Sequence, residues 1–159
     1  MTVQIRPATS ADVPTIASLI GALARFEKLE SEVTMTEAAL HATLYGPRPY
    51  AETVLAEEDG KAVGFALFFH NYSTFLARPG LYLEDLYVLE SHRGKGIGKS
   101  LLAHLAKIAV ERGCGRMEWA VLDWNVEAIG FYERLGARPN SDWTVYRLTG
   151  ESLTRLAGK

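Results

Sequence analysis

An apolar strand, a run of alternating glycines and a helix follow one another in mid-chain, and this stretch most constrains the fold. Residues 81–88 (LYLEDLYV) alternate and are rich in Leu, Tyr and Val, which is typical of a largely buried strand. Glycines stand at 94, 96 and 98, before an apolar pattern of helical spacing over 101–108. Such glycines let the backbone approach a ligand, and the first amides of a helix are unpaired. The stretch therefore predicts a site for a phosphate-bearing ligand.

Three kinds of phosphate-binding loop place glycines before a helix, and their spacing separates them. The nucleotide P-loop pattern, Gly-x-x-x-x-Gly-Lys-Ser/Thr, fits Gly98-Lys99-Ser100, but Arg93 stands where that pattern begins with glycine. The dinucleotide pattern, Gly-x-Gly-x-x-Gly, does not fit glycines that recur at every second position. A third pattern, Arg-x-x-Gly-x-Gly, is matched by Arg93, Gly96 and Gly98. The sequence favours this third loop.

Length and composition bound the kind of molecule. A chain of 159 residues, 48% hydrophobic and 23% charged, is typical of one globular domain, so we expect a single domain over 1–159. A net charge of −2 without a basic block argues against a nucleic-acid partner. We see no long apolar run and no signal-peptide pattern, and we expect no membrane partner. The single cysteine, Cys114, fits a reducing compartment, so we expect a cytoplasmic location.

The order of the predicted elements indicates an α/β fold. Strands are predicted at 3–6, 53–57, 63–69, 81–88, 117–122 and 143–148. Helices are predicted to end near 26, 44, 112 and 136, with a short turn or helix at 152–156. Antiparallel hairpins come first and a β-α-β crossover follows. We therefore expect a mixed sheet with helices on both faces.

The loop and its surroundings resemble the GCN5-related N-acetyltransferase (GNAT) superfamily over nearly the whole chain. Arg93 to Gly98 resembles its pyrophosphate loop, residues 83–88 its central strand, and residues 5–8 (IRPA) its first strand. Trp124-Asn125 and residues 131–137 (FYERLGA) resemble its second cofactor motif. The resemblance implies the GNAT fold, with a mostly antiparallel central sheet, and acetyl-CoA as co-substrate. It also implies an enzyme that is commonly a homodimer.

Within the superfamily, several stretches are similar to the diamine (spermidine/spermine) and thialysine acetyltransferases. They lie at 24–27, 82–85, 93–98 and 121–125. The residues expected to hold acetyl-CoA are Leu86, Tyr87, Val88, Arg93, Gly94, Lys95, Gly96, Ile97, Gly98, Lys99, Ser100, Asn125, Ala128 and Tyr132. Arg93 and Lys99 flank the loop and can neutralise pyrophosphate, whereas Lys95 either does the same or is solvated. The four histidines lack metal-ligand spacing, so we expect no metal.

Acetylation of an amine needs a base, because a free alkylamine with a pKa of about 10.4 is almost entirely protonated at pH 7. The resemblance assigns proton acceptance to Glu84; the alternative is a strand-end carboxylate held by backbone amides. Regular alternation would place Glu84 and Asp85 on opposite faces, so the two cannot share one role. The resemblance implies that Asp85 lies near the amine-binding side or supports it. Tyr132 can protonate the leaving sulfur, or else it is a core aromatic of its helix.

The resemblance also implies a cationic substrate. The residues expected to bind it are Phe26, Glu27, Glu84, Asp85, Glu118, Trp119 and Trp143. Carboxylates beside aromatic rings suit a small amine. The loop at 72–75 lacks the aspartate that polyamine enzymes carry there, which favours a diamine or a lysine-like amino acid. The alternatives are a protein or peptide acetyltransferase and a non-catalytic acyl-CoA-binding module.

Overall fold

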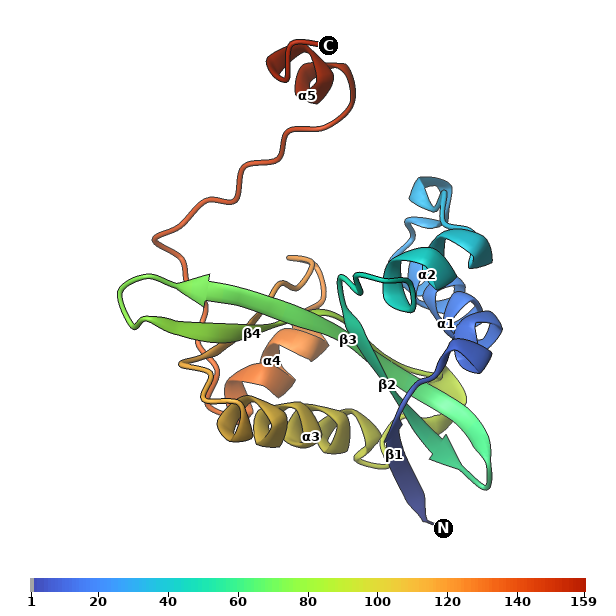
Figure 1. Cartoon of the computed structure of the whole chain (residues 1–159). Helices are drawn as coiled ribbons and strands as arrows, with labels where there is room; N and C mark the ends of the chain where they lie inside the picture. Colours follow the sequence, from blue (N-terminus) through green and yellow to red (C-terminus); the bar gives the residue numbers. More distant parts are fainter. Residues whose placement is uncertain (1) are drawn as a thin grey trace. The chain divides into compact units, whose positions relative to one another are not determined.

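The computed structural model of the chain describes residues 2–159, which form two compact units (Figure 1). The first unit is Met1–Ala120 and holds the sheet, and the second is Val121–Lys159. Helices α4 (Val126–Arg134) and α5 (Gly150–Leu156) belong to the second unit. No helix of the described chain is both long and apolar enough to cross a membrane.

The first unit is built on a five-stranded mixed sheet in the order β1-β2-β3-β4-β5 (Figure 1). The strands are β1 (Val3–Pro7), β2 (Glu52–Glu58), β3 (Lys61–Ser73), β4 (Arg78–Val88) and β5 (Met117–Trp119). Strands β1 to β4 pair antiparallel, and β5 pairs parallel to β4. A parallel pair needs a crossover, which helix α3 (Ile97–Glu111) supplies. The predicted mixed sheet is therefore confirmed.

Helices cover both faces of this sheet, as predicted. Helices α1 (Val13–Phe26) and α2 (Glu37–Leu44) bury their apolar stripes on the face that carries Phe65 and Tyr87. The core there consists of Val13, Ile16, Leu19, Leu23, Leu40, Leu44, Leu55, Phe65 and Tyr87. Gly64 lies on the opposite face, where a Cβ would stand 3.5 Å from Leu101 of α3. This burial of apolar side chains on both faces fixes the sheet between its helices.

Two predicted strands differ from the structure. The strand expected at 117–122 ends at Trp119, and residues 143–148 form no strand although their side chains alternate. Trp143, Val145 and Tyr146 are 76%, 88% and 93% exposed. A β-prone pattern describes side chains that suit a pleated surface, but a strand also needs a partner, and none pairs with this segment. The short helix expected at 152–156 is confirmed as α5.

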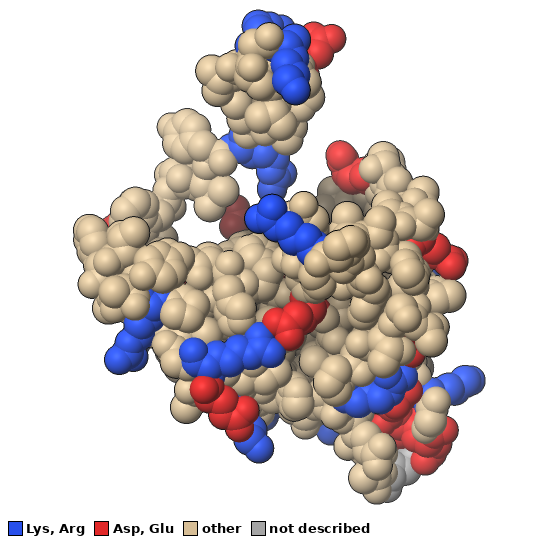
Figure 2. Space-filling model, viewed as in Figure 1, with Lys and Arg blue, Asp and Glu red and all other residues tan. Residues whose placement is uncertain are grey.

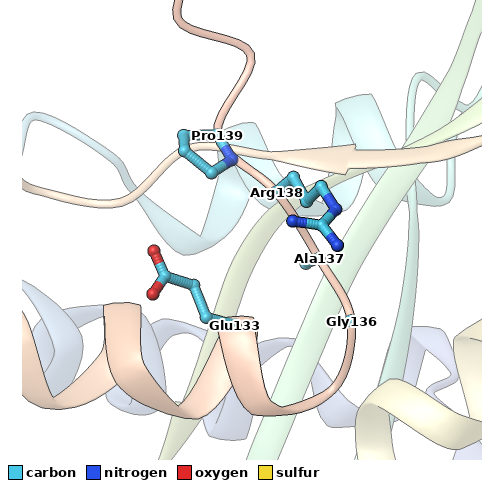
Figure 3. A pocket seen from close by; sticks show the side chains of 5 residues that line it. All are labelled: Glu133, Gly136, Ala137, Arg138 and Pro139. Atoms are coloured by element: carbon cyan, nitrogen blue, oxygen red, sulfur yellow. The ribbon is translucent and has the colours of Figure 1, made fainter.

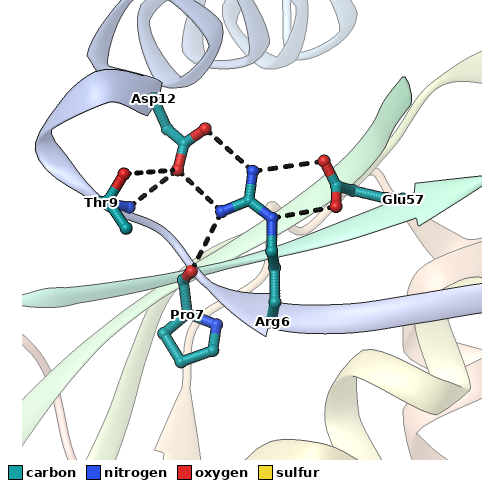
Figure 4. A network of polar contacts seen from close by, with 5 residues as sticks. All are labelled: Arg6, Pro7, Thr9, Asp12 and Glu57. Carbon is teal, nitrogen blue, oxygen red and sulfur yellow. Dashed lines mark hydrogen bonds and ion pairs between the residues drawn. The ribbon is translucent and has the colours of Figure 1, made fainter. Parts of the chain in front are cut away.

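A charged network joins β1, the start of α1 and β2 (Figure 4). The Arg6 guanidinium donates to both carboxylate oxygens of Asp12, at 2.8 and 2.9 Å, and to those of Glu57, at 2.9 and 3.2 Å. Asp12 also accepts a 2.7 Å hydrogen bond from the backbone N–H of Thr9. Hydrogen bonds from Arg6 lower the pKa of Asp12 to about 2. The ionised carboxylate is therefore favoured in the folded state.

Asp12→Asn is expected to lower the free energy of unfolding at pH 7 by about 1–2 kcal/mol, because the partly exposed ion pair with Arg6 and the hydrogen bond from the Thr9 N–H are both weakened. A carboxylate with a lowered pKa stabilises the fold above its unfolded pKa, and that contribution is lost as pH falls from about 4 to about 2. Urea unfolding at pH 7 and pH 3 measures both effects. Equal stability of variant and wild type at pH 7 would contradict the role of the network.

Candidate active site

The centre of β4 contains an irregular residue at Glu84. Leu83 pairs with Phe68 and Asp85 pairs with Leu67, so Glu84 is an extra residue without a partner on β3. A bulge of this kind interrupts the alternation of side chains along a strand. The expectation that Glu84 and Asp85 lie on opposite faces assumed regular alternation, and that assumption is wrong here. The Glu84 charge in fact acts on Asp85 and raises its pKa.

Beyond the bulge, β4 has an edge that β5 does not cover. The parallel pairing of β4 with β5 runs only from Leu81 to Leu83, opposite Met117 to Trp119. Within the described sheet, residues 84–88 have no strand partner on this side. An open strand edge binds an extended molecule through backbone hydrogen bonds. Leu86, Tyr87 and Val88, which the sequence assigned to the cofactor, lie along this edge.

Two half-buried carboxylates, those of Asp85 and Glu27, interact where α1 ends beside β4. Burial first, and then the charges of Glu84 and Glu27, raise the pKa of Asp85 to about 6. Glu27 is the C-cap residue of α1, and burial raises the pKa of its carboxyl as well. Acidic groups that gather in a partly buried place and raise one another's pKa favour a positively charged ligand.

Aromatic rings and a guanidinium pack together where the end of α1 meets β4. The rings of Phe26 and Tyr87 lie 6.2 Å apart, and the Arg93 guanidinium lies 4.4 Å from the Phe26 ring centre and 5.3 Å from that of Tyr87. The Nε of Arg93 donates to the carbonyl of Val88 at 3.1 Å. Arg93 thus connects the start of the glycine-rich loop with the end of α1 and with β4.

The glycine-rich loop has the backbone geometry of an anion site. Gly94 and Gly96 have φ of 80° and 81°, which is the left-handed region that glycine adopts without strain. No atom beyond the chain neighbours lies within 4 Å of where a Cβ would stand, so the backbone angle and not crowding requires glycine. The first α-helical bond of α3 runs from Ser100 N–H to the Gly96 carbonyl. The N–H groups of residues 97–99 therefore have no helical acceptor and fit a diphosphate.

A second group of side chains lies where β3, β4 and β5 run side by side. The Tyr82 ring lies 5.2 Å from that of Phe69, and burial, Glu84 and Glu118 raise the pKa of its hydroxyl. Glu118 is held at 3.2 Å by both Arg116 Nε and Asn71 Nδ2. Sequence reasoning missed Tyr82 and Asn71, because only the pairing register brings them beside the predicted residues.

The second unit carries the remaining predicted residues. The Asn125 side chain accepts from Ala128 N–H at 3.3 Å, which confirms it as the cap of α4, and Tyr132 lies in that helix. Trp143 lies outside every helix and strand. A hollow after α4 contains none of the predicted site residues (Figure 3); its lining is Glu133, Gly136, Ala137, Arg138 and Pro139. The catalytic and cofactor roles of Tyr132 and Asn125 stay predictions.

Charged side chains of both signs are interspersed on the face drawn in Figure 2. No continuous basic surface is seen on that face. The local concentration of acidic groups around β4, and not a general field of one sign, therefore distinguishes the site.

Comparison with known proteins assigns the chain to a family. The sequence model of the acetyltransferase (GNAT) family matches residues 21–137. The chain belongs to this family. It is accordingly an acyltransferase, and the GNAT fold and family predicted from its loop are confirmed.

Relatives of this GNAT chain are similar over almost their whole length. It is 38% identical to a thialysine N-epsilon-acetyltransferase of Bos taurus, covering 99% of the chain and 98% of the relative. It is also 38% identical to an L-ornithine N5-acetyltransferase of Arabidopsis thaliana, covering 96% of the chain and 87% of that relative. Among solved structures, an integron cassette protein of V. cholerae superposes with a TM-score of 0.84 at 28% identity, and the match covers 100% of this chain and 99% of the cassette protein.

Asp85→Asn is expected to stabilise the fold at pH 7.5 by about 1–2 kcal/mol, since the buried charge is removed. A carboxyl whose pKa is raised by folding destabilises the folded state as the pH rises from the pKa in the unfolded chain, about 4, through the pKa in the folded protein, about 6. The gain should therefore shrink toward pH 4. Urea unfolding at both pH values measures the effect.

Asp59→Asn is the matched control, because Asp59 lies exposed in the β2–β3 turn. It is expected to change stability little at either pH. A destabilised Asp85→Asn protein at pH 7.5 would show that Asp85 is compensated by a partner, and would contradict the strained acidic site.

Proposed function

We propose that the protein transfers an acetyl group from acetyl-CoA to a primary amine of a small cationic substrate. The observation that carries the proposal is the convergence of Glu27, Glu84 and Asp85 beside the rings of Phe26 and Tyr87, next to the phosphate-type loop. Carboxylates and aromatic faces together favour an ammonium group. Relatives that are named for thialysine and L-ornithine acetylation support the same class of substrate.

The acetyl donor is assigned to the loop and to the open edge of β4. GNAT acetyltransferases use acetyl-CoA, which supplies an activated acetyl thioester. The amides of residues 96–99 hold its diphosphate, and Lys99 adds positive charge. Backbone groups of residues 86–88 align the extended arm. Asn125, Ala128 and Tyr132 are assigned to the cofactor by the sequence resemblance alone. The open space around Gly94 and Gly96 and the uncovered strand edge support this assignment.

Proton transfer is assigned to Glu84 and Tyr132. Glu84 is exposed at the bulge, so it can take the ammonium proton directly or through a water. Asp85, with its pKa raised to about 6, is mostly ionised at neutral pH and orients the ammonium group. The phenolic O–H of Tyr132 donates a proton to the departing sulfur.

A short amine suits this arrangement better than a long polycation. The carboxylates around β4 form one compact group, whereas Glu118 is already held by Arg116 and Asn71. The β3–β4 turn, residues 74–77, carries no acid that could bind a distant second charge. We therefore propose a diamine or a lysine- or ornithine-like amino acid.

We further propose that residues 1–159 act as one acetyltransferase domain, in the cytoplasm and as a homodimer. The family match runs across the boundary at Ala120, which supports a single functional domain. The single cysteine suits a reducing compartment. Sedimentation equilibrium tests the dimer, and a mass of one chain at micromolar concentration would contradict it.

An amine panel with acetyl-CoA tests the proposed reaction. Free thiol release should depend on the amine, with L-ornithine, L-lysine, thialysine or a diamine faster than spermine or a lysine-containing peptide. A preference for the peptide would replace the small-amine proposal. No amine-dependent release from any acceptor would contradict the function.

Tyr132→Phe is expected to lower kcat by about 10²- to 10⁴-fold while the Kd for CoA changes less than about twofold, since only the acidic proton is removed. Stopped-time thiol assays and calorimetry measure the two quantities. Tyr146→Phe is the control, because Tyr146 is almost fully exposed. Loss of CoA binding in Tyr132→Phe would instead identify Tyr132 as a structural residue.

A further inference from the structure

A buried carboxylate outside the predicted site lies against the glycine-rich loop. Glu58, the last residue of β2, has a side chain that is only 7% exposed. Its Oε2 lies 3.0 Å from Nε2 of His92, and its Oε1 lies 3.7 Å from Nζ of Lys95. Buried acidic groups are tolerated in proteins when they are paired. Both partners of Glu58 belong to the loop region that is assigned to the diphosphate.

The two contacts hold the loop on either side of Arg93 and Gly94. His92 ends the short 3-10 helix η3 (Glu90–His92), and its Nδ1 lies 2.8 Å from the Ser91 hydroxyl. Lys95 stands between Gly94 and Gly96, both of which have left-handed φ. One carboxylate therefore fixes the entry of the loop and its centre at the same time.

Between Arg93 and Ile97, whose side chain is buried at the start of α3, the loop has few other means of holding its shape. Gly94 and Gly96 have no side chains, and no distant atom lies within 4 Å of their Cβ positions. A glycine segment without packing partners samples many backbone conformations. On the α1 side the loop is held by Arg93, which contacts Phe26 and Tyr87. Glu58 supplies the corresponding attachment on the β2 side.

Considered only as a negative charge, Glu58 would weaken the binding of a diphosphate at this loop. A carboxylate beside an anion site repels the anion and also neutralises Lys95, the cation nearest the centre of the loop. If the loop acted only through its positive field, removal of Glu58 would strengthen diphosphate binding. The burial of a carboxylate at this place therefore indicates that the position of the loop matters more than its net charge.

We propose that Glu58 is a positioning residue for the donor-binding loop. Through His92 and Lys95 it holds the backbone of residues 94–98 so that the amides face the diphosphate of acetyl-CoA. Glu58 acts through these residues and does not touch the ligand. The identity of the ligand rests on the proposed function, whereas the anchoring of the loop does not.

Glu58→Gln separates the two roles by the sign of its effect. Positioning predicts CoA binding about tenfold weaker, which corresponds to about 1.4 kcal/mol, whereas charge repulsion alone predicts tighter binding. Calorimetric titration with CoA measures the change. Pantetheine lacks the diphosphate, so its affinity is expected to stay unchanged. Equal or tighter CoA binding by the variant would overturn the proposal.

Glu57→Gln is the matched control on the same strand. The Glu57 carboxylate pairs with Arg6 and not with the loop, so CoA affinity is expected to remain within about twofold. Lys95→Met removes one partner of Glu58 and is expected to weaken CoA binding. The variant with both substitutions should then bind CoA no more weakly than the single variant that has the lower CoA affinity. Fully additive losses would mean that Lys95 binds phosphate independently, and would contradict the proposal.

Hydrogen exchange without any ligand tests the anchoring directly. Amides of residues 94–98 are expected to exchange faster in Glu58→Gln and in Lys95→Met than in wild type or Glu57→Gln. Unchanged exchange in both loop variants would overturn the positioning role. If wild type bound no CoA, the proposed function would fail, yet the exchange rates would still decide whether Glu58 anchors the loop. Lys95 is exposed, so Lys95→Met serves if Glu58→Gln does not fold.

Discussion

The extra residue at Glu84 determines how the site is arranged. From Leu81 to Leu83, strand β4 is paired on both sides, and its alternation matches that of its neighbours. After the bulge the strand keeps its β3 partner but has no β5 partner, and Asp85 comes to the same face as Tyr87 and α1. The inserted residue therefore lies where the acidic groups gather and where the uncovered edge of β4 begins, which are the places proposed for the acceptor and the donor.

Carboxylates in this protein divide into paired and uncompensated groups. Asp12 and Glu58 have cationic or imidazole partners within about 4 Å, and they join elements of the first unit to one another. Asp85 is buried beside other acids, and its raised pKa expresses the free energy that this placement costs. Electrostatic strain is thus concentrated at β4, in the place proposed for the cationic substrate, whereas the charges of Asp12 and Glu58 are compensated by their partners.

Local sequence patterns predicted much of the fold because glycines, caps and apolar spacing act over a few residues. The loop at 93–98, the cap at Asn125 and the helices around Leu19 and Leu101 are of this kind. The bulge at Glu84 and the partners of Glu58 depend on register between strands, which no local pattern encodes. For the same reason the alternating residues 143–148 suggested a strand that has no partner.

The stacking of Arg93 has a consequence for the two substrates. Its backbone belongs to the loop that is proposed to bind the donor, while its guanidinium lies against Phe26, the neighbour of Glu27 in the proposed acceptor site. The two halves of the site therefore share one side chain. By thermodynamic reciprocity, if binding of one substrate positions Arg93 and so strengthens binding of the other, the second substrate strengthens binding of the first by the same factor. Arg93 is a physical route by which the affinities for donor and acceptor become linked.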